Sequence, residues 1–492
     1  MQERLSLNHM ARVAFIQEEA RTRQGIMILS AVLKKHGHAT GVFATDEPGE
    51  KVKAELKDFN PDILAFSTGT PSQKRALNFA REMKQANRNL YIMMGGPHPT
   101  FYPNVLEENE FLDAICIGEG EDALLETANN VGNIGKISSI RNLRVRDGRK
   151  IYRNDPRPLI DNLDELPDPD YQVYFDKFPM LANSDTKIFM VGRGCPFPCT
   201  YCFNKKYMDI YKGKGTYIRF KSISKIINEI KGLKKRYPIK WVQFNDDTFN
   251  INRKWLEAFL VEYRKEVGLG FLCNLRVDFI DEDLIKGLKA AGVDRIDIGI
   301  EHGNEEFRKK FLKRDISNEQ IMQAGWLFHK YKIRFHTGNI VGFPDETLSM
   351  AFETVHINQK VGPDVATCGV LQPFPGTEIY NYVADRKILK KGTTIDDFRA
   401  QKSWTSGQAR ISSVIEQKNM RELINLHCFF ALLVKHPSLE WPVRMLIKLP
   451  YNRLFQFVGH MGMFGFHWKY ARGPKEKLNN LKKAFEIFFK KS

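Results

Sequence analysis

Short apolar segments alternate with amphipathic segments along the first part of the chain. Four apolar runs have the length of buried strands: Arg12–Gln17, Asp62–Ser67, Tyr91–Met94 and Asp113–Ile117. Two stretches between them have apolar residues at helical spacing: Gly25–Lys35 and Ser72–Ala86. Because strands and helices alternate in this way in doubly wound proteins, the pattern predicts an α/β domain with a parallel, Rossmann-like sheet.

The alternation resumes after Lys187 with longer units. Six strands are predicted there: Ile188–Val191, Trp241–Phe244, Phe271–Leu275, Arg295–Ile300, Ile333–Val341 and Val365–Leu371. Helical stretches separate them: Ser222–Tyr237, Lys254–Glu266, Asp281–Ala291, Asn318–Tyr331 and Glu346–Val361. Six strand–helix units are fewer than the eight of a closed barrel, so the pattern predicts a partial (β/α)6 barrel of the TIM type.

These patterns divide the chain into four segments. The stretch between the two α/β regions is charged, contains several prolines and shows no sustained period, and the end of the chain becomes helical and aromatic. We therefore expect a Rossmann-like domain over residues 1–136, a linker over 137–182, a barrel over 183–400 and a helical extension over 401–492.

Composition excludes several classes of protein. Of the 492 residues, 42% are hydrophobic and 27% are charged, which is ordinary globular usage and excludes disordered and fibrous proteins. The start of the chain lacks the apolar core of a signal peptide, and no apolar run is long enough to span a membrane. Seven cysteines are too few for a secreted disulfide scaffold. We therefore expect a protein of a reducing, cytoplasmic compartment.

Positive charge is concentrated near the C-terminal end. The formal net charge is +17, and eleven Lys and Arg against two Glu fall between Trp441 and Ser492, among eleven aromatic residues. A helical lid on the barrel with solvated lysines would explain this composition. A peripheral contact with an anionic membrane surface or an apolar substrate would explain it as well. Nucleic-acid binding is the least favoured interpretation.

Three of the seven cysteines, Cys195, Cys199 and Cys202, fall in one loop directly after a predicted strand. Thiolates this close can converge on a soft metal centre, and a reducing compartment favours metal binding over a disulfide. Three ligands without a nearby fourth suit a 4Fe-4S cluster with one open iron, since structural zinc is usually closed by four ligands. A chance grouping of buried thiols is the alternative. The remaining cysteines are expected in the core: Cys116, Cys273, Cys368 and Cys428.

The spacing Cys-x3-Cys-x2-Cys, with Tyr201 just before the last cysteine, resembles the signature loop of the radical S-adenosylmethionine superfamily. The resemblance implies a 4Fe-4S cluster whose open iron binds S-adenosylmethionine. It also implies a one-electron donor such as flavodoxin or ferredoxin. Reductive cleavage of S-adenosylmethionine would then give a 5′-deoxyadenosyl radical that abstracts a hydrogen atom from the substrate.

The resemblance continues at the ends of later barrel strands, where a barrel places its chemistry. An Asn-Asp-Asp triplet stands where the family has Gly-Gly-Glu, and the segment Gly338–Glu346 matches the fifth strand, with Asp345 or Glu346 as its acid. The residues that the resemblance assigns to S-adenosylmethionine are Tyr201, Asn245, Asp246, Asp247, Arg276, Glu301, Ile340 and Gly342.

Each of these residues has a structural alternative. A carboxylate at the end of a strand can cap a helix or pair with a base. Arg276 can pair with Asp278 or with Glu282, and Gly338 and Gly342 can serve close strand packing only.

The N-terminal segment resembles the cobalamin-binding domain that precedes the barrel in one large radical S-adenosylmethionine subfamily. Residues at its strand ends carry the resemblance and are expected to bind cobalamin: Ser67, Thr68, Thr70, Gly95, Gly96, His98, Gly118 and Glu119. Many cobalamin proteins ligate cobalt through the histidine of Asp-x-His-x-x-Gly, but the loop Gln17–Gly25 contains no histidine. We therefore expect base-off cobalamin, and His98 in contact with the nucleotide tail or the backbone. A response-regulator-like domain without a ligand is the alternative.

The resemblances together imply a cobalamin-dependent radical enzyme that methylates an unactivated carbon of a small-molecule substrate, apolar or acidic in character. A ring-forming enzyme of the anaerobic magnesium-protoporphyrin IX monomethyl ester cyclase type would have the same layout. A protein of another class, a non-enzymatic cobalamin or redox sensor, would carry the same cofactors without cleaving S-adenosylmethionine.

Overall fold

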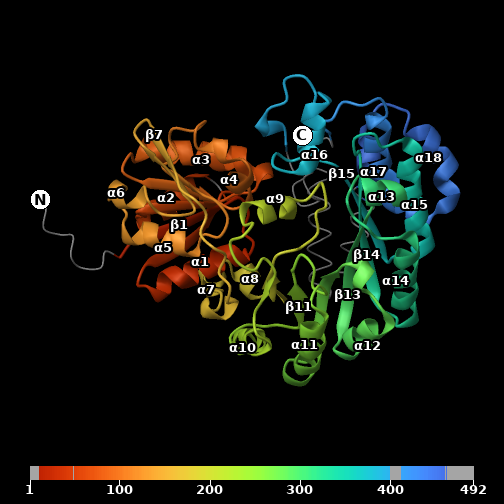
Figure 1. Cartoon of the computed structure of the whole chain (residues 1–492), viewed down its shortest axis with the longest axis horizontal. Coiled ribbons are helices and arrows are strands. Elements are labelled where there is room, and N and C mark those ends of the chain that lie inside the picture. Colours follow the sequence, from red (N-terminus) through yellow and green to blue (C-terminus); the bar gives the residue numbers. More distant parts are fainter. Residues whose placement is uncertain (1–9, 48, 399–411, 460, 462–492) are drawn as a thin grey trace, which may run out of the picture. The chain divides into compact units, whose positions relative to one another are not determined.

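The computed structural model of the chain describes residues 10–47, 49–398, 412–459 and 461 (Figure 1). Contacts group the chain into two compact units, named here unit 1 and unit 2. Unit 1 holds residues 1–196 and 203–242, and unit 2 holds residues 197–202 and 243–492. The units do not follow the expected segment boundaries, because the start of the predicted barrel groups with the N-terminal domain.

Unit 1 contains a seven-stranded sheet in the order β2-β1-β3-β4-β5-β6-β7. Five strands pair in parallel: β1 (Arg12–Gln17), β2 (Ala39–Ala44), β3 (Ile63–Ser67), β4 (Tyr91–Gly95) and β5 (Ala114–Cys116). An antiparallel hairpin of β6 (Leu143–Asp147) and β7 (Lys150–Arg153) extends the sheet beyond β5. The central strands are apolar and buried along almost their whole length, as expected for parallel strands covered on both faces.

Helices connect the parallel strands: α1 (Gln24–Lys35), α2 (Gly49–Phe59), α3 (Gln73–Ala86), α4 (Pro97–Phe101) and α5 (Glu121–Asn129). The apolar face of α3, with Phe79 and Ala80, packs into the same core as Phe66 of β3 and Ile92 of β4. This arrangement confirms the predicted Rossmann-like domain.

The sequence pattern misses two parts of unit 1. The first half of β2 is half-buried and contains Thr40 and Gly41, so its apolar run is too short to be recognised, and α2 buries only Val52 and Leu56. The hairpin of β6 and β7 lies in the segment expected to be a linker. Its first strand alternates buried and half-buried side chains, a pattern typical of a strand near a sheet edge.

The second sheet has six strands in the order β15-β14-β13-β12-β11-β8. Its strands are β8 (Thr186–Phe189), β11 (Trp241–Phe244), β12 (Gly270–Leu275), β13 (Val293–Glu301), β14 (Arg334–Val341) and β15 (Val365–Val370). All six predicted strands are confirmed, and the pairs from β12 to β15 are parallel. The architecture is the predicted partial barrel.

Helices follow the strands of this sheet: α10 (Ile223–Lys234), α11 (Arg253–Glu266), α12 (Glu282–Ala290), α13 (Glu305–Lys310), α14 (Asn318–Lys330) and α15 (Leu348–Val361). Each begins after a residue whose side-chain oxygen accepts a hydrogen bond from a backbone amide of the first turn: Ser222, Asn252, Asp281, Asn304, Ser317 and Thr347. These caps fix where the strand-end loops stop and the helices start.

Among the described residues, the helices α16 (Glu378–Asp385), α17 (Met420–Lys435) and α18 (Glu440–Leu446) follow β15, and residues 453–459 are helical as well. Helix α17 packs on α15 and β15 and buries Leu423, Leu426, Phe430 and Leu433, which confirms the helical extension for these residues. The rest of the basic tail, from residue 462 onward, lies outside the described residues. Among the helices that are described, none combines the length and the hydropathy needed to cross a membrane.

Candidate functional site

The three clustered cysteines share the loop between β9 (Gly192–Arg193) and α9 (Phe203–Ile210). Cys199 is buried, Cys195 and Cys202 are half-buried, and none of the three forms a disulfide bond. The Cys202 amide donates a hydrogen bond to the Cys199 carbonyl oxygen over 3.0 Å, which tightens the second half of the loop. The loop therefore offers three reduced thiols as metal ligands within eight residues, 195–202.

A buried arginine lies beside the Cys199 thiol. The Arg314 side chain hydrogen-bonds to Cys199 and donates to the Gly299 carbonyl oxygen over 2.6 Å. Burial opposes the charge of this guanidinium, but Tyr201, Glu301 and Cys199 raise the pKa of Arg314 above its ordinary value. Because a nearby cation favours the thiolate, the form that binds iron, Arg314 supports a cluster at this loop.

Tyr201 and Glu301 meet next to this arginine. The Tyr201 hydroxyl hydrogen-bonds to the Glu301 carboxylate, and burial raises the pKa of Glu301 while Arg314 counteracts the shift. Glu301 ends β13 with φ at +67°, a backbone conformation that non-glycine residues rarely adopt. Gly299 makes room for it, since a Cβ at Gly299 would lie 2.1 Å from Glu301 Oε1. The strand end therefore aims a carboxylate at the cysteine loop.

Arg276 is held by protein partners after β12. It forms an ion pair with Asp278 at 2.8 Å, and its guanidinium carbon lies 3.4 Å from the centre of the Phe197 ring in the cysteine loop. Of the two acids that the sequence offered as partners of Arg276, Asp278 is therefore the one that pairs with it, and Glu282 pairs with Lys330 of α14. The side chain of Asn250, which the sequence did not single out, exchanges two hydrogen bonds of 2.9 Å with the Arg276 backbone.

The Asn-Asp-Asp triplet follows β11. Asp246 is buried, whereas Asn245 and Asp247 are exposed. The Asn274 side chain donates to the Asp246 carbonyl oxygen over 3.2 Å, so this loop is tied to the end of β12. Burial makes Asp246 the better candidate for the amine of S-adenosylmethionine, and its role remains a prediction.

Glu346 organises the turn after β14. Its Oε2 accepts hydrogen bonds from the amides of Gly342 over 2.5 Å and Phe343 over 3.0 Å, and its Oε1 lies 3.2 Å from His302 Nε2. Asp345 points to partners on α16 and is largely exposed. Of the two acids that the sequence offered, Glu346 is therefore the one that shapes the segment.

Ile340 lies on β14 just ahead of this turn. It is half-buried and packs against the core of unit 2. Its predicted contact with S-adenosylmethionine stays a prediction.

The ends of β3 and β4 lie together in unit 1. The Thr68 amide donates to the Gly95 carbonyl oxygen, and the His98 amide donates to the Thr68 carbonyl oxygen, each over 2.9 Å. Gly96 has φ at +91°, and a Cβ there would lie 3.0 Å from the Thr68 oxygen. Ser67 ends β3 in a half-buried position. Small residues thus gather at the strand ends where a cobalamin tail could approach the backbone.

His98 is completely buried beneath these strand ends. Its Nδ1 lies 3.2 Å from the Thr70 hydroxyl oxygen, whereas its Nε2 has no hydrogen-bond partner among the described residues. Burial lowers the pKa of His98 to about 4, so the ring is neutral at physiological pH. The structure thus places a buried polar atom without a protein partner among the residues expected to bind cobalamin.

Glu119 is held by protein partners. Its carboxylate accepts hydrogen bonds from Arg193 over 2.8 Å and from Arg219 over 2.9 Å, and its expected contact with cobalamin stays a prediction. The Gly118 amide donates to the Thr100 hydroxyl oxygen over 3.1 Å and keeps its backbone at the strand end.

The other cysteines are mostly in the core. Cys116, Cys273 and Cys428 are buried as predicted, and Cys368 is half-buried. Burial raises the pKa of all four, to about 12 for Cys116 and Cys428, so they stay protonated. In the described part of the chain, no group of three or more His, Cys, Asp or Glu side chains converges on one point, the three cysteines of the loop included, so the loop supplies the types of ligand for a metal centre and not a preformed site.

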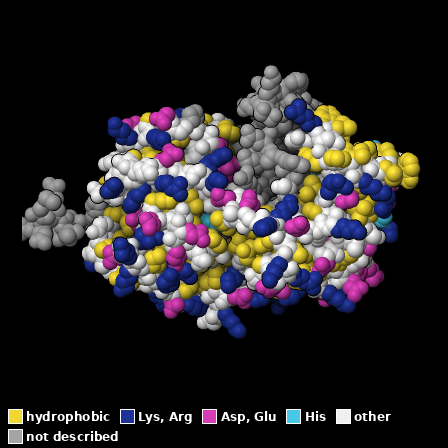
Figure 2. Space-filling view, turned by 90° about the horizontal axis from the view of Figure 1, so that it is seen from above, with side chains coloured by type: hydrophobic (Ala, Val, Ile, Leu, Met, Phe, Trp, Pro, Cys, Tyr) yellow, Lys and Arg dark blue, Asp and Glu magenta, His cyan; other side chains and the backbone are white. Residues whose placement is uncertain are grey.

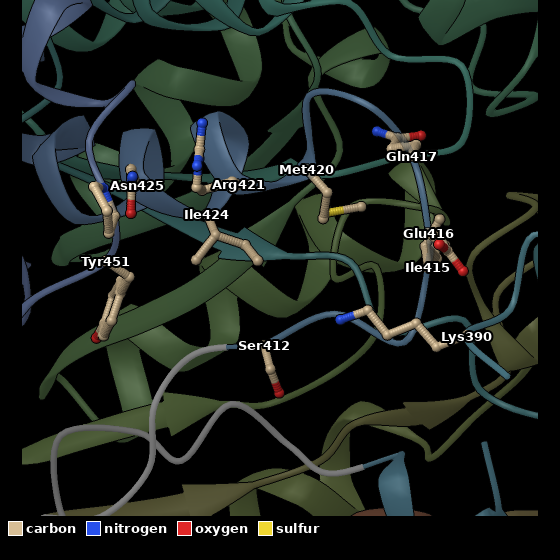
Figure 3. A pocket seen from close by; sticks show the side chains of 11 residues that line it. Lys390, Ser412, Ile415, Glu416, Gln417, Met420, Arg421, Ile424, Asn425 and Tyr451 are labelled. Carbon is tan, nitrogen blue, oxygen red and sulfur yellow. The ribbon is translucent and has the colours of Figure 1, made fainter. Parts of the chain in front are cut away.

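A cavity of about 550 Å³ opens beside α17 in unit 2 (Figure 3). Ile415, Met420 and Ile424 form an apolar part of its lining, and the Lys390 ammonium also faces it. The Met420 sulfur lies 3.5 Å from the position of a Cβ on Gly342, so the cavity adjoins the turn that Glu346 organises.

Comparisons with known proteins agree with this geometry. The model of the radical SAM superfamily, where SAM is S-adenosylmethionine, matches residues 189–356, and the model of the B12 binding domain matches residues 22–128. An uncharacterized methyltransferase of Pyrococcus horikoshii is 30% identical over 361 residues, which are 72% of this chain and 77% of that protein. The chain belongs to the B12-binding radical SAM superfamily.

Two further proteins show how far the similarity extends. The anaerobic magnesium-protoporphyrin IX monomethyl ester cyclase of Rubrivivax gelatinosus is 27% identical over 377 residues, 73% of this chain and 66% of the cyclase. The structure of the radical SAM methyltransferase TsrM from Kitasatospora setae, with cobalamin and a 4Fe-4S cluster bound, superposes with a TM-score of 0.70 at 15% identity. It covers 97% of this chain and 99% of TsrM, which shows a shared fold.

The cofactors of this radical SAM enzyme are a 4Fe-4S cluster, S-adenosylmethionine and cobalamin. The residues present fit them. Three cysteines outside any disulfide, with a charged arginine beside Cys199, supply the ligand chemistry of an iron–sulfur cluster, and the buried carboxylates at the strand ends suit a charged ligand. The small residues around Gly96 and the unpartnered His98 Nε2 suit a bulky ligand that contacts backbone.

Proposed function

We propose that this radical SAM enzyme methylates an unactivated carbon atom of a small-molecule substrate. The observation that carries the proposal is the combination, in one chain, of the group formed by Arg314, Glu301 and Tyr201 beside Cys199 with a B12-binding domain. The Pyrococcus horikoshii relative, which is named a methyltransferase, supports it. The cluster and S-adenosylmethionine supply hydrogen abstraction, and cobalamin supplies a transferable methyl group.

The chain's own residues prepare the site for this reaction. In this proposal the Arg314 guanidinium lies beside the Cys199 sulfur, and the Glu301 carboxylate, held by Tyr201, binds the polar groups of S-adenosylmethionine. The Tyr201 ring packs edge-on against Phe343 at 6.2 Å, within the main apolar core of unit 2. This packing keeps water away from the buried side of the cysteine loop and protects a reactive species from quenching.

The test is anaerobic reconstitution of the full chain, reduction, and mass spectrometry of all products formed from a pool of candidate metabolites. A product heavier by one CH2 unit, together with 5′-deoxyadenosine and S-adenosylhomocysteine, supports methylation. Cys199→Ala should abolish the methylated product and 5′-deoxyadenosine, whereas Cys428→Ala, at a buried cysteine outside the loop, should retain them. A reduced, cluster-loaded protein that leaves S-adenosylmethionine intact would refute the proposal and favour a sensor.

Oxidative ring formation is the second candidate function. It is supported by the 27% identity to the Rubrivivax gelatinosus cyclase, although this chain spans only 66% of that protein. A product that has lost hydrogen or gained oxygen, without a gain of a methyl group, would favour this reaction over methylation.

The electron donor is a small acidic protein of the flavodoxin or ferredoxin class in this proposal. The net charge of +17 favours encounter with an acidic partner, and this attraction weakens as salt rises. The rate of cluster reduction by flavodoxin should therefore fall with ionic strength. A rate that is independent of salt would argue against such a donor.

The cavity beside α17 supports a substrate with an apolar body and an acidic group. Ile415, Met420 and Ile424 offer apolar surface, and the Lys390 ammonium can pair with a carboxylate or phosphate. Arg421 and Glu416 also line the cavity, so Lys390 is one of two cations that face one carboxylate there. Decanoate should bind the protein more tightly than decanol, and Lys390→Gln should weaken that preference. Equal binding of the two probes would show that the cavity does not select acids.

The last described segment supports contact with an anionic membrane surface. Among the described residues, fourteen large hydrophobic side chains are exposed, and seven of them lie between 441 and 461: Trp441, Met445, Leu446, Leu449, Leu454, Phe457 and Met461. Figure 2 shows hydrophobic side chains gathered over the part of the molecule that carries the C-terminal helices. Lys448 and Arg453 lie among them and form no ion pair with another described residue. Apolar side chains interleaved with cations are typical of a surface that lies on lipid.

Vesicle sedimentation tests this contact. The protein should sediment with phosphatidylglycerol vesicles at low salt and dissociate at high salt, and it should not bind phosphatidylcholine vesicles. Trp441→Asp, at a side chain that is 75% exposed, should weaken binding, whereas Trp326→Asp, at an exposed tryptophan on α14, should not. Equal sedimentation of the two variants would show that the segment does not contact lipid.

A further inference from the structure

Both flanks of the cysteine loop are anchored to the B12-binding domain within unit 1. Upstream, Arg193 stands two residues before Cys195, and its guanidinium is enclosed by two carboxylates from the loop after β5. Its Nη1 lies 2.8 Å from Glu119 Oε1, and its Nη2 lies 2.6 Å from Glu121 Oε1. An arginine that is held by two acids at once can hardly shift without breaking a charged hydrogen bond.

A second arginine completes this group. Arg219 of β10 (Arg219–Phe220) pairs with Arg193 across the two-stranded sheet and donates to both Glu119 oxygens, over 2.9 Å and 3.2 Å. The Ile160 amide donates to Glu119 as well, over 3.0 Å. Burial alone would raise the pKa of Glu119, but the two arginines hold it below its ordinary value, so the carboxylate stays charged.

The downstream flank is anchored to the same domain. Phe203, directly after Cys202, stacks on Phe101 of α4 with ring centres 4.3 Å apart and planes 11° apart. The Tyr211 hydroxyl accepts a hydrogen bond from the Glu119 amide over 2.9 Å. A Cβ at Gly118 would lie 1.9 Å from that hydroxyl, so a side chain there would displace the tyrosine.

The loop that holds both flanks also belongs to the ligand edge of the first sheet. The Gly118 amide donates to the Thr100 hydroxyl oxygen over 3.1 Å, and Thr100 donates onward to the Gly96 carbonyl oxygen over 2.8 Å. Gly96 lies at the strand end expected to receive cobalamin. A ligand that orders the Gly96 turn therefore orders residues 118–121, and these residues order the start and the end of the cysteine loop.

We propose that residues 118–121 couple the two cofactor sites, with Glu119 and Arg193 as positioning residues, so that cobalamin binding and cluster assembly strengthen each other. Such coupling is reciprocal. If the cluster raises the affinity of the protein for cobalamin by some factor, cobalamin raises the affinity of the protein for the cluster by the same factor. The inference rests on the cofactors of the superfamily and is independent of methyl transfer, so the two can fail separately.

The experiment measures hydroxocobalamin affinity by absorbance titration, using full-length protein before and after reconstitution of the cluster. We expect the dissociation constant to fall about fivefold or more when the cluster is present. In Glu119→Gln the dissociation constants for hydroxocobalamin with and without the cluster should become nearly equal, while iron content and cobalamin binding persist. The reduced cluster of the wild type, but not of Glu119→Gln, should also change its electron paramagnetic resonance spectrum when cobalamin is added.

Glu107→Gln is the matched control. Glu107 also pairs with two arginines of unit 1, Arg153 at 2.8 Å and Arg144 at 3.8 Å, but neither arginine flanks the cysteine loop. It should keep the wild-type ratio. If Glu119→Gln fails to fold, Glu121→Gln can replace it, because it weakens one of the two acceptors of Arg193. The ratio of the cobalamin dissociation constants without and with the cluster should then lie between one and the wild-type value. Equal affinities in wild-type protein with and without the cluster, or an unchanged ratio in a folded variant at Glu119 or Glu121, would overturn the proposal.

Discussion

The strand ends expected to face the cofactors carry different kinds of side chain in the two parallel sheets. At the first sheet, the strand ends carry glycines, hydroxyls and a neutral histidine, with Gly96, Thr68, Thr70 and His98 in contact with one another. At the second sheet, the strand ends carry buried charges such as Asp246, Arg276, Glu301 and Glu346.

The difference follows from what each edge has to hold. A large ligand that approaches the backbone needs space, and space is provided by missing side chains. A compact, charged ligand needs fixed charges in a site of low dielectric, and those charges must be compensated when no ligand is bound. Substitutions should therefore damage the two units in different ways. In unit 1 they fill space that a ligand needs, and in unit 2 they leave a charge without its partner.

The largest effect is expected from Gly118→Ala. The new Cβ would overlap the Tyr211 hydroxyl, and the residue would keep a φ of +79°, so we expect a loss of about 3 kcal/mol or more in stability. Gly132→Ala is the control, because Gly132 has a φ of +87° but nothing within 4 Å of its Cβ position, and only about 1 kcal/mol of backbone strain is expected there. Urea unfolding measures both. Equal losses would show that crowding at Gly118 is unimportant.

A pH dependence follows from His98. Its pKa falls from 6.5 in the unfolded chain to about 4 in the folded protein, because burial opposes the charged ring. The unfolded state therefore binds the proton first, and the contribution of His98 is complete above pH 6.5 and declines as the pH falls toward 4, by up to about 3 kcal/mol. Unfolding free energies at pH 7 and pH 5 should differ less in His98→Gln than in wild type. His36→Gln, at an exposed site, should behave like wild type.

At the second sheet, Glu346→Gln tests the charged edge. The substitution keeps the shape but weakens the acceptor for the Gly342 and Phe343 amides and for His302, so we expect a loss of about 2 kcal/mol and weaker binding of S-adenosylmethionine. Asp345→Asn, at the exposed neighbour, should cost little. Equilibrium dialysis with S-adenosylmethionine and thermal unfolding measure both effects. An unaffected Glu346→Gln would show that the turn does not depend on charge.

The smallest effect on stability is expected from Ile424→Trp, which fills part of the cavity beside α17. Because Ile424 borders open space, the larger side chain should change stability by less than about 1 kcal/mol. It should raise the KM for the substrate and leave the uncoupled cleavage of S-adenosylmethionine unchanged. A variant with normal substrate affinity would remove the cavity from the substrate site.

The fold was largely predictable because periodicity is a local signal. All six strands of the second sheet are uninterrupted apolar or alternating runs, whereas β2 is interrupted by Gly41 and the hairpin of β6 and β7 is too polar to recognise. The cysteine loop was found through spacing. The partners of Glu119 were missed, because Arg193 and Arg219 stand 74 and 100 residues away and no local pattern links them. Asn250 was missed for the same reason.

The hairpin of β6 and β7 has a consequence for how the protein behaves in concentrated solution. Strand β7 ends the first sheet, and the outer strand of a sheet can pair with a strand of another molecule and start aggregation. Here Lys150 and Arg153 stand at the two ends of β7, both exposed, and Lys150 folds over the Tyr152 ring at 4.1 Å. Two molecules that approached edge to edge would bring these cations together. The hairpin thus disfavours pairing between copies of the protein at the β7 edge of this sheet.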